Sequence, residues 1–339
     1  MDEACITLGH GAGGRPMQAL IQELLLPLFD NPALAALEDQ ARLPLPTQPG
    51  CRLAMSTDGY VVSPLCFPGG DIGCLAVNGT VNDLAVGGAV PRYLSCAFII
   101  EEGLPMALLR QICQSLAQAA REAGVSIVTG DTKVVPRGQA DKLFITTSGV
   151  GEIPAGVDLG MHRIAAGDAL LVSGPLGDHG ATILAARQEL GLSCQVQSDT
   201  QPLHGLMQAL LARVPGLHCA RDLTRGGLNA VAHEFAAASG LSLWLEEDAL
   251  PIRPAVASLC ELLGLDPLQL ACEGRLLACV APAQAEQALA VMAHWPGGEG
   301  AARVGAVGEA EASPVLLHSA LGVVRALAMG EGEALPRIC

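Results

Sequence analysis

The sequence predicts a two-domain protein of the α+β (mixed α/β) class, and three observations lead to this prediction. The chain has 339 residues, which is longer than one hydrophobic core ordinarily needs. Strand-like and helix-like segments alternate through two stretches of the chain. A polar, glycine-containing joint at 158–167 separates those stretches. We therefore expect four parts: a flexible glycine loop with an entry helix at 1–50, an N-terminal domain at 51–157, a C-terminal domain at 168–327, and a mobile tail at 328–339.

The entry segment opens with a glycine-rich loop, and one amphipathic helix is expected after it, from about Pro16 to Phe29. Glycines expose backbone N–H groups, and a helix N-terminus behind them favours anions, so Gly11, Gly13 and Gly14 are candidate phosphate contacts. A disordered loop is the alternative. The letters also fit a dinucleotide-binding pattern, but no βαβ unit follows, which disfavours that fold.

The N-terminal domain is expected to follow a strand–helix–strand–helix–strand–strand order. The second helix has proline in its first turn and Gly124 just past its end, which is the usual asymmetry of helix termini. The expected strands are 52–57, 92–100, 125–130 and 143–153, and the expected helices are 71–86 and 105–123.

The C-terminal domain is expected to be a second mixed unit. Its expected strands are 169–173, 241–245, 276–280, 303–307 and 315–317, and its expected helices are 179–190, 202–212 and 228–238. From Met329 to Cys339 the sequence has two glycines, a proline and no periodicity, which indicates a flexible tail.

Charge and cysteine usage exclude several classes of function. The formal net charge is −15, and an acidic chain without a basic stripe is a poor nucleic-acid binder. No apolar run is long enough to predict a membrane span. The twelve cysteines include no CxxC pair, so we expect neither a zinc ribbon nor a disulfide framework, but a reducing, cytoplasmic compartment. Only two lysines occur, Lys133 and Lys142.

Five aspartates stand beside Gly, Thr or Asn, where the backbone can approach a ligand. Carboxylates and phosphate oxygens are the ligands that Mg²⁺ prefers, so such a set suits Mg²⁺–ATP. For any single aspartate, capping of a turn is the simpler reading. Asn82 and Asp83 are the exception, because they lie inside an otherwise apolar helical segment. The five are Asp58, Asp71, Asp83, Asp131 and Asp222.

Lys133 and Glu273 are candidate proton-transfer groups. Lys133 follows Asp131 by two residues, so in an extended segment both side chains point to one face. It could neutralise phosphate, act as a base if desolvated, or simply form a surface ion pair. Glu273, if it lies near Lys133, could take a proton from an amide; the alternative is a solvated turn residue paired with Arg275. His233 lacks the second histidine of a zinc-protease motif.

Cys339 is the last residue, on a tail without periodicity. It does not fit a lipidation box, which needs cysteine four from the end. Two interpretations remain open from position alone: an incidental cysteine, or a carrier thiol that the tail presents first to one site and then to another.

Six motifs, taken together and in order, resemble the HypE family, the carbamoyl dehydratases of [NiFe]-hydrogenase maturation. The aspartate motifs are shared with the wider PurM-like ATP-binding superfamily, whereas the terminal tetrapeptide is the most specific. The motifs are Gly-His-Gly-Ala-Gly-Gly-Arg, Ser-Thr-Asp-Gly, Val-Asn-Asp-Leu-Ala, Gly-Asp-Thr-Lys-Val-Val, Arg-Asp-Leu-Thr-Arg-Gly-Gly and the terminal Pro-Arg-Ile-Cys.

The resemblance implies a two-domain PurM-like fold, with an N-terminal domain that dimerises in a β-barrel-like manner and a C-terminal α/β sandwich domain. HypF would load a carbamoyl group onto Cys339. ATP would then drive its dehydration to a thiocyanate, and the HypC–HypD complex would accept the cyano group on iron. The resemblance assigns catalysis to Cys339, Lys133 and Glu273. It assigns Mg²⁺ to Asp58, Asp83, Asp131 and Asp222, and ATP to Gly11, Gly13, Gly14, Asp58, Asn82, Asp83, Asp131, Thr132 and Asp222.

Two other classes of function stay open at this level. One is another PurM-like enzyme, of the selenophosphate or aminoimidazole ribonucleotide synthetase type, although Cys5 lacks the neighbouring lysine expected of the former. The other is a non-catalytic maturation scaffold. The sequence does not decide the resting position of the tail, the number of Mg²⁺ ions and their ligands, the first base, or the partner surfaces.

Overall fold

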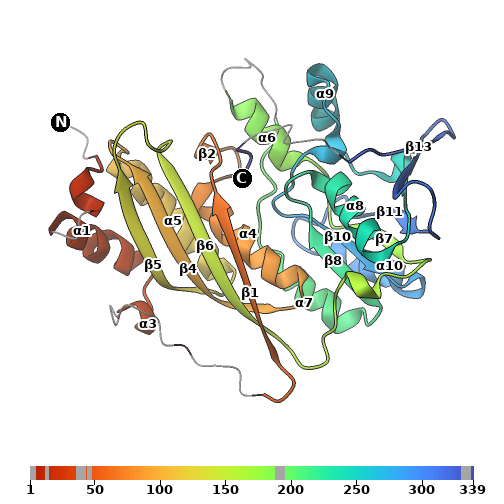
Figure 1. Ribbon diagram of the computed structural model, residues 1–339, viewed down its shortest axis with the longest axis horizontal. Helices are drawn as coiled ribbons and strands as arrows, with labels where there is room; N and C mark the ends of the chain where they lie inside the picture. The colour runs from red at the N-terminus through yellow and green to blue at the C-terminus, as the bar shows by residue number, and fades with distance from the viewer. Residues whose placement is uncertain (1–4, 12–14, 36–42, 44–47, 188–194, 330–336) are drawn as a thin grey trace.

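The protein folds around two β-sheets that lie side by side, one in each half of the chain (Figure 1). The computed structural model describes residues 5–11, 15–35, 43, 48–187, 195–329 and 337–339. Within this part of the chain, no helix is long and apolar enough to cross a membrane.

The N-terminal sheet has four strands in the order β1-β6-β4-β5. Only the β4–β5 pair is parallel, and helix α5 connects those two strands. A small β2–β3 hairpin precedes α4. The elements of this half are β1 (Arg52–Tyr60), β2 (Cys66–Phe67), β3 (Gly70–Asp71), α4 (Ile72–Val86), β4 (Val90–Glu101), α5 (Met106–Glu122), β5 (Ser126–Val135) and β6 (Leu143–Ile153).

Helix α4 begins where a carboxylate can cap it. The Asp71 side chain accepts from the backbone N–H groups of Gly73 and Cys74, which are otherwise without partners at a helix N-terminus. The helix is apolar on all sides because it is buried between the two sheets. Gly79 gives it room against β1, since a Cβ there would collide with the Tyr60 hydroxyl group.

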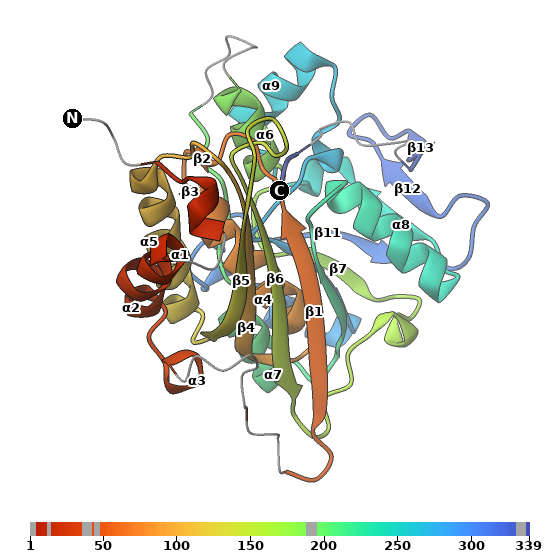
Figure 2. The ribbon, with the colours of Figure 1, turned by 60° about the vertical axis from the view of Figure 1, so that its left-hand side comes forward.

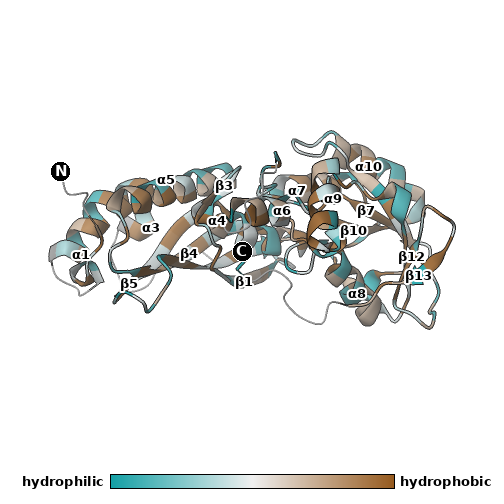
Figure 3. Cartoon of the chain, turned by 90° about the horizontal axis from the view of Figure 1, so that it is seen from above, coloured by the Kyte–Doolittle hydropathy of each residue, from teal (hydrophilic) through white to brown (hydrophobic). Residues whose placement is uncertain are grey.

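One face of the N-terminal sheet is covered and the other is open. Figure 3 shows α4 and α5 on the same side of the sheet, with no described helix on the opposite side. The side chains of the open face include large apolar groups, of which Leu53 is 54% exposed and Met55 is 74% exposed. An apolar sheet face of this kind indicates that another surface covers it.

The entry segment lies against the β5 edge of this sheet. The expected helix is present, but a π-helical turn interrupts it. The elements are a 3-10 turn η1 (Leu8–Gly11), α1 (Arg15–Leu20), the π-helical η2 (Ile21–Leu25), α2 (Leu26–Leu28) and α3 (Pro32–Ala35).

The C-terminal sheet has seven strands in the order β13-β12-β9-β11-β7-β10-β8. Helices α7 and α10 pack on one face of it and α8 on the other. The strands are β7 (Ala169–Val172), β8 (Leu217–Asp222), β9 (Leu243–Glu246), β10 (Leu276–Val280), β11 (Ala302–Val307), β12 (Val315–His318) and β13 (Val324–Ala326). The helices are α6 (Asp178–Ala186), α7 (His204–Arg213), α8 (Gly227–Ser239), α9 (Pro254–Leu263) and α10 (Ala285–Ala293).

Asn82 joins the two halves. Its amide nitrogen donates to the carbonyl oxygens of Gln201 and Glu273, at 3.1 and 3.2 Å, and its oxygen accepts from Leu203 N–H at 2.7 Å. This explains a polar residue within an apolar helix, because a buried amide must be hydrogen-bonded. The C-terminal end of α4 also packs among the apolar side chains of α7.

Each expected strand and helix has a counterpart in the structure, with bounds that differ by a few residues. The elements of the C-terminal domain that were not expected include β8, α9 and α10. Part of the expected helix at 179–190 and much of the expected tail fall outside the described residues.

Candidate active site

Four carboxylates gather where α4, β1 and the C-terminal domain meet. We call Asp58, Asp83, Asp222 and Glu273 the acidic half-site. Asp83 accepts a 2.5 Å hydrogen bond from the hydroxyl group of Ser56 on β1. Asp58 lies two residues further along the same strand, and so faces α4 as well. Asp222 ends β8, and Glu273 precedes β10, the neighbouring strand.

The charges of these carboxylates oppose one another. Burial raises the pKa of Asp222 to about 7, and the charges of Asp83 and Asp58 add to that effect. Burial also raises the pKa of Glu273 well above its ordinary value, with further contributions from Asp222, Asp199 and Asp58. Such a cluster favours a bound cation, because a cation would stabilise the charged form of each carboxylate.

Two oxygen atoms of the half-site are buried without a hydrogen-bond partner, Oδ2 of Asp222 and Oε1 of Glu273. Buried polar atoms are rarely left in this state, so a ligand that supplies positive charge or N–H donors fits here. Among the described residues, no three His, Cys, Asp or Glu side chains converge closely enough to hold a metal ion by themselves. A metal ion in this half-site would therefore need further ligands from a bound molecule.

The loop that carries Glu273 is fixed from both domains. Its N–H donates to Oδ1 of Asp199 at 3.0 Å, and its carbonyl oxygen accepts from Asn82. Arg275 lies 3.4 Å from Asp199 in a buried ion pair. The alternative of a solvated turn residue paired with Arg275 is therefore wrong, because Glu273 is buried and Arg275 pairs with Asp199.

Asn82 was expected to contact ATP directly. Its amide instead makes three hydrogen bonds to the backbone of the C-terminal domain, and the residue is 1% exposed. A nucleotide contact would require the amide to leave these partners. The contacts support a role in positioning the Glu273 loop.

A second group of candidate residues gathers at the opposite edge of the same sheet. We call Gly11, Asp131, Thr132 and Lys133 the β5 half-site. The Lys133 ammonium group donates to Asp131 at 3.0 Å, so the two side chains share one face, as expected. Gly11 packs on β5, where a Cβ would approach the Val134 nitrogen to 2.7 Å. Gly13 and Gly14 lie outside the described residues.

The two half-sites do not meet within one chain. The strand register places Asp58 opposite Thr147, Thr147 opposite Cys96, and Cys96 opposite Gly130. Three strand spacings of about 4.8 Å separate Asp58 from Gly130, which is about 14 Å. Lys133 therefore does not lie beside Glu273 in the same chain, as Figure 1 makes visible from the places of β5 and β8.

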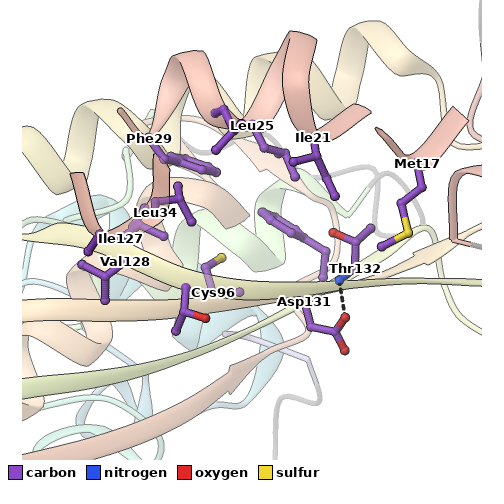
Figure 4. A pocket seen from close by; sticks show the side chains of 15 residues that line it. Met17, Ile21, Leu25, Phe29, Leu34, Cys96, Ile127, Val128, Asp131 and Thr132 are labelled. Atoms are coloured by element: carbon purple, nitrogen blue, oxygen red, sulfur yellow. Dashed lines mark hydrogen bonds between the residues drawn. The ribbon is translucent and has the colours of Figure 1, made fainter. Parts of the chain in front are cut away.

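An apolar cavity of about 210 Å³ adjoins the β5 half-site. We call it the entry cavity. Figure 4 shows Ile21, Leu25 and Phe29 of the entry segment above it, and Thr132 at the strand that forms its floor. The Asp131 side chain points away from the cavity and accepts from Thr132 N–H at 2.8 Å. An apolar slot beside a polar edge is typical of a small-molecule site.

The last three residues of the chain dock between the domains. The Cys339 carbonyl oxygen accepts from Val61 N–H at 3.0 Å, and the Arg337 carbonyl oxygen accepts from Ser63 N–H at 3.2 Å. Val61 directly follows Tyr60, the phenol whose pKa is raised by burial and by the charges of Asp58, Glu273 and Asp83. Figure 2 shows the C-terminus at the end of β1. The tail end thus docks on the segment that directly follows β1, the strand that carries Asp58.

The residues that hold the docked tail could not be singled out from the sequence. His179 and Arg187 lie on and directly after α6, and Asp141 lies in the loop before β6. The one available signal was Gly177-Asp-His-Gly180, a polar pair between glycines in an otherwise apolar stretch. Contacts made across the whole chain length leave no local pattern.

Family models match both halves of the chain. The N-terminal domain of AIR synthase related proteins matches residues 37–153, and their C-terminal domain matches residues 165–316. A solved structure of the thiamine monophosphate kinase ThiL, bound to AMPPCP and TMP, has the same fold at 18% identity, with a TM-score of 0.63 over 91% of this chain and 94% of that one. The expected PurM-like fold is confirmed.

Proteins of much higher similarity include several carbamoyl dehydratases named HypE. The carbamoyl dehydratase HypE of Escherichia coli is 55% identical over 98% of this chain and 99% of its own. A crystal structure of HypE in complex with ATP has 49% identity and a TM-score of 0.93 over 98% of this chain and 99% of that one. A HypE–HypF complex matches at 42% identity, with a TM-score of 0.79 over 92% and 100%. The chain belongs to the HypE family of carbamoyl dehydratases.

Proposed function

We propose that this protein uses ATP to dehydrate a carbamoyl group carried on Cys339 to a thiocyanate. The observation that carries the proposal is the docked tail, whose last residue is hydrogen-bonded to Val61, directly after β1, the strand that carries Asp58. The cyano group would become a ligand of the iron in [NiFe]-hydrogenase. A selenophosphate or aminoimidazole ribonucleotide synthetase has no need of a docked terminal cysteine, and a scaffold has no need of the carboxylates.

The acidic half-site fits Mg²⁺ that is bound together with a nucleotide. Asp58, Asp83 and Asp222 supply hard oxygen ligands whose mutual repulsion a cation relieves. They do not form a complete metal site alone, and phosphate oxygens would supply the remaining ligands. When bound, the metal would neutralise phosphate charge.

The β5 half-site and the entry cavity fit the other parts of ATP. The apolar walls of the cavity suit a flat adenine ring, and Thr132 and Asp131 lie at its polar edge. Lys133 would attract the phosphates, and Gly11, Gly13 and Gly14 would approach them through backbone N–H groups.

The atoms balance because the oxygen that the carbamoyl group loses leaves as part of inorganic phosphate, and ATP becomes ADP. The carbonyl oxygen of the S-carbamoyl group attacks the γ-phosphorus of ATP, ADP leaves, and the oxygen becomes part of a phosphate ester. Two N–H protons are removed as the C–O bond breaks, so that inorganic phosphate departs and a C≡N triple bond remains on sulfur. The docked tail excludes water that would otherwise attack the activated carbon.

Glu273 and Lys133 are the proposed acceptors of the two protons. A carboxylate in an apolar, acidic environment binds a proton strongly, so Glu273 becomes an effective base once cations have stabilised its charged form. Lys133 would attract the phosphates as an ammonium group, and it would act as a base only once it is desolvated and has lost its own proton. Because Lys133 lies on β5, at one edge of the N-terminal sheet, and Glu273 lies in the C-terminal domain beyond the opposite β1 edge, this pairing requires a second chain.

We infer a homodimer in which the open faces of two N-terminal sheets meet. Closing two four-stranded sheets into a barrel-like unit would cover Leu53 and Met55. It would also place the β1 edge of one copy beside the β5 edge of the other. Each acidic half-site would then be completed by the partner's β5 half-site.

HypF is the proposed donor of the carbamoyl group, because a relative forms a complex with a protein of that name. The HypC–HypD complex is the proposed acceptor of the cyano group. We place the reaction in the cytoplasm, where thiols stay reduced.

Mass spectrometry of the tail peptide tests the proposal. The protein is incubated with HypF, carbamoyl phosphate and ATP, and we expect a carbamoyl adduct on Cys339 that loses water only when ATP is present. The Glu273→Gln variant should keep the adduct and lose the dehydration. Cys66→Ala, which removes another exposed thiol, is the matched control and should behave as the parent. No adduct on Cys339 with active HypF would refute the proposal.

A further inference from the structure

The docked tail is held by few backbone contacts. Two hydrogen bonds, from Val61 N–H and Ser63 N–H, hold it alongside the segment after β1, with the two segments running in opposite directions. The Ile338 side chain is buried among apolar residues of the N-terminal domain. So short a pairing is marginal by itself, and the side chains around it decide whether it persists.

Asp141 holds the side chain of Arg337. The guanidinium group donates to the Asp141 carboxylate and to the Val61 carbonyl oxygen, the latter at 2.8 Å. Its carbon lies 5.7 Å from the centre of the Phe144 ring, a cation–π distance. The hydrogen bond from Arg337 is also the main cause of the lowered pKa of Asp141.

Arg187 holds the backbone of the tail and of its partner segment. Its Nε donates to the Ser63 carbonyl oxygen at 3.2 Å, and its Nη2 donates to the Arg337 carbonyl oxygen at 3.1 Å. A single planar guanidinium group thereby bridges the two paired segments. Arg187 belongs to the C-terminal domain, whereas Asp141 belongs to the N-terminal one.

His179 holds the next peptide group. Its Nε2 lies 2.7 Å from the Ile338 carbonyl oxygen, which only accepts, so Nε2 carries the proton. Nδ1 then accepts a hydrogen bond from the Ser198 hydroxyl group at 2.8 Å. Burial lowers the pKa of His179 to about 4, so the ring stays neutral in this tautomer near neutral pH.

Docking also carries a cost in backbone conformation. Arg337 has a φ of 56°, in the left-handed region that residues with a Cβ seldom adopt. The contacts of Asp141, Arg187 and His179 must offset this strain and the loss of chain entropy. The docked and undocked states are thus balanced by a small number of polar contacts.

We propose that Asp141, His179 and Arg187 form a latch that sets the equilibrium between two states of the tail. The docked state is used for dehydration and the undocked state for loading. The inference rests on the proposed function, because only a carrier tail must leave its site to be loaded. Loosening the latch should slow dehydration and hasten loading. These are positioning residues, since they act on the tail and not on the reacting atoms.

The first measurement needs no activity. Trypsin cleaves after Arg337 only when that side chain is released, and intact mass reports the loss of the last two residues. Asp141→Asn should raise the cleavage rate by roughly 1.5- to fivefold, the range set by losing one partly exposed ion pair. The control is Glu246→Gln, which removes a carboxylate that accepts a hydrogen bond from His318 at similar exposure, far from the tail, and should leave the rate unchanged.

The second measurement separates the two half-reactions. In Asp141→Asn and His179→Leu, the HypF-dependent loading rate should rise, while single-turnover dehydration of the loaded protein falls. His179→Gln keeps a donor for the Ile338 carbonyl oxygen and should restore most of the dehydration rate. Thermal midpoints verify that each variant is folded. If a His179 variant does not fold, Asp141→Asn still tests the latch, because the Asp141 carboxylate is partly exposed and its replacement should leave the fold intact.

The outcomes distinguish the inference from the function beneath it. If the parent protein is neither loaded nor dehydrated, the proposed function fails while the trypsin result still reports the latch. If the parent works, and the variants leave cleavage unchanged or lower both half-reactions equally, the latch is wrong.

Discussion

At the scale of single residues, the site is defined by carboxylates that the fold has removed from water. The sequence identified Asp58, Asp83, Asp222 and Glu273 as residues of interest from their glycine-rich surroundings and from the family resemblance. It did not predict that Glu273 is buried, because the apolar walls around it come from strands and helices distant in sequence. Burial and mutual repulsion, rather than residue type, set the high proton affinities.

The raised pKa of Asp222 makes folding stability depend on pH. The folded protein binds this proton more tightly than the unfolded chain, so stability falls as pH rises from the ordinary value of 3.8 to about 7. Asp222→Asn should therefore stabilise the metal-free protein at pH 8 by about 2–4 kcal/mol.

Thermal denaturation across pH measures this effect. The gain should vanish near pH 4, where the parent carboxyl is also protonated, and Mg²⁺ with ATP should stabilise the parent more than the variant. An equal gain at every pH would contradict the assignment.

At the scale of elements, the sequence predicted most of the layers that position the site. The strands of the N-terminal sheet and α4 were expected from periodicity and from glycine and proline punctuation. The strand β8 was not, because Leu217–Asp222 is short and alternates poorly, and the sheet around it decides its conformation. The order of the strands in the sheet could not be predicted from the sequence, so only the structure shows that the two half-sites are separated.

That separation predicts complementation between two inactive variants. Lys133→Ala removes the β5 half-site and Glu273→Gln removes the acidic one. When the two variants are mixed at random, about half of the dimers contain one chain of each variant. Each mixed dimer has one intact site out of two, so about a quarter of the parent's dehydration activity should return.

Co-refolding or co-expression followed by the tail-peptide assay gives the measurement. Each variant alone should be inactive, and a mixture of Lys133→Ala with itself is the control for handling. If the mixture recovers nothing although mixed dimers form, both half-sites belong to one chain after all.

At the scale of the whole molecule, the open sheet face is the feature that links fold to function. The sequence implied dimerisation only through its family, since an alternating strand does not reveal which face a partner covers. The exposed apolar side chains of β1 give this expectation a location. A charge placed there should disturb the assembly without disturbing the chain's own core.

Met55→Glu is the corresponding test. The side chain is 74% exposed, so the monomer should fold normally, whereas burial of an unpaired carboxylate in the dimer is strongly unfavourable. Light scattering should report a monomer, and dehydration should be lost. Leu262→Glu, at a position that is 68% exposed on α9, is the matched control and should remain dimeric. A dimeric, active Met55→Glu protein would rule out this face.

The scarcity of aromatic residues has an optical consequence. Both tyrosines, Tyr60 and Tyr93, belong to the N-terminal domain, and both tryptophans, Trp244 and Trp295, belong to the C-terminal domain. Tryptophan emission therefore reports the unfolding of one domain, and tyrosine absorbance reports that of the other. Asn82 forms hydrogen bonds between the two domains. The difference between the denaturation midpoints of the two signals therefore measures how strongly the unfolding of one domain is coupled to that of the other.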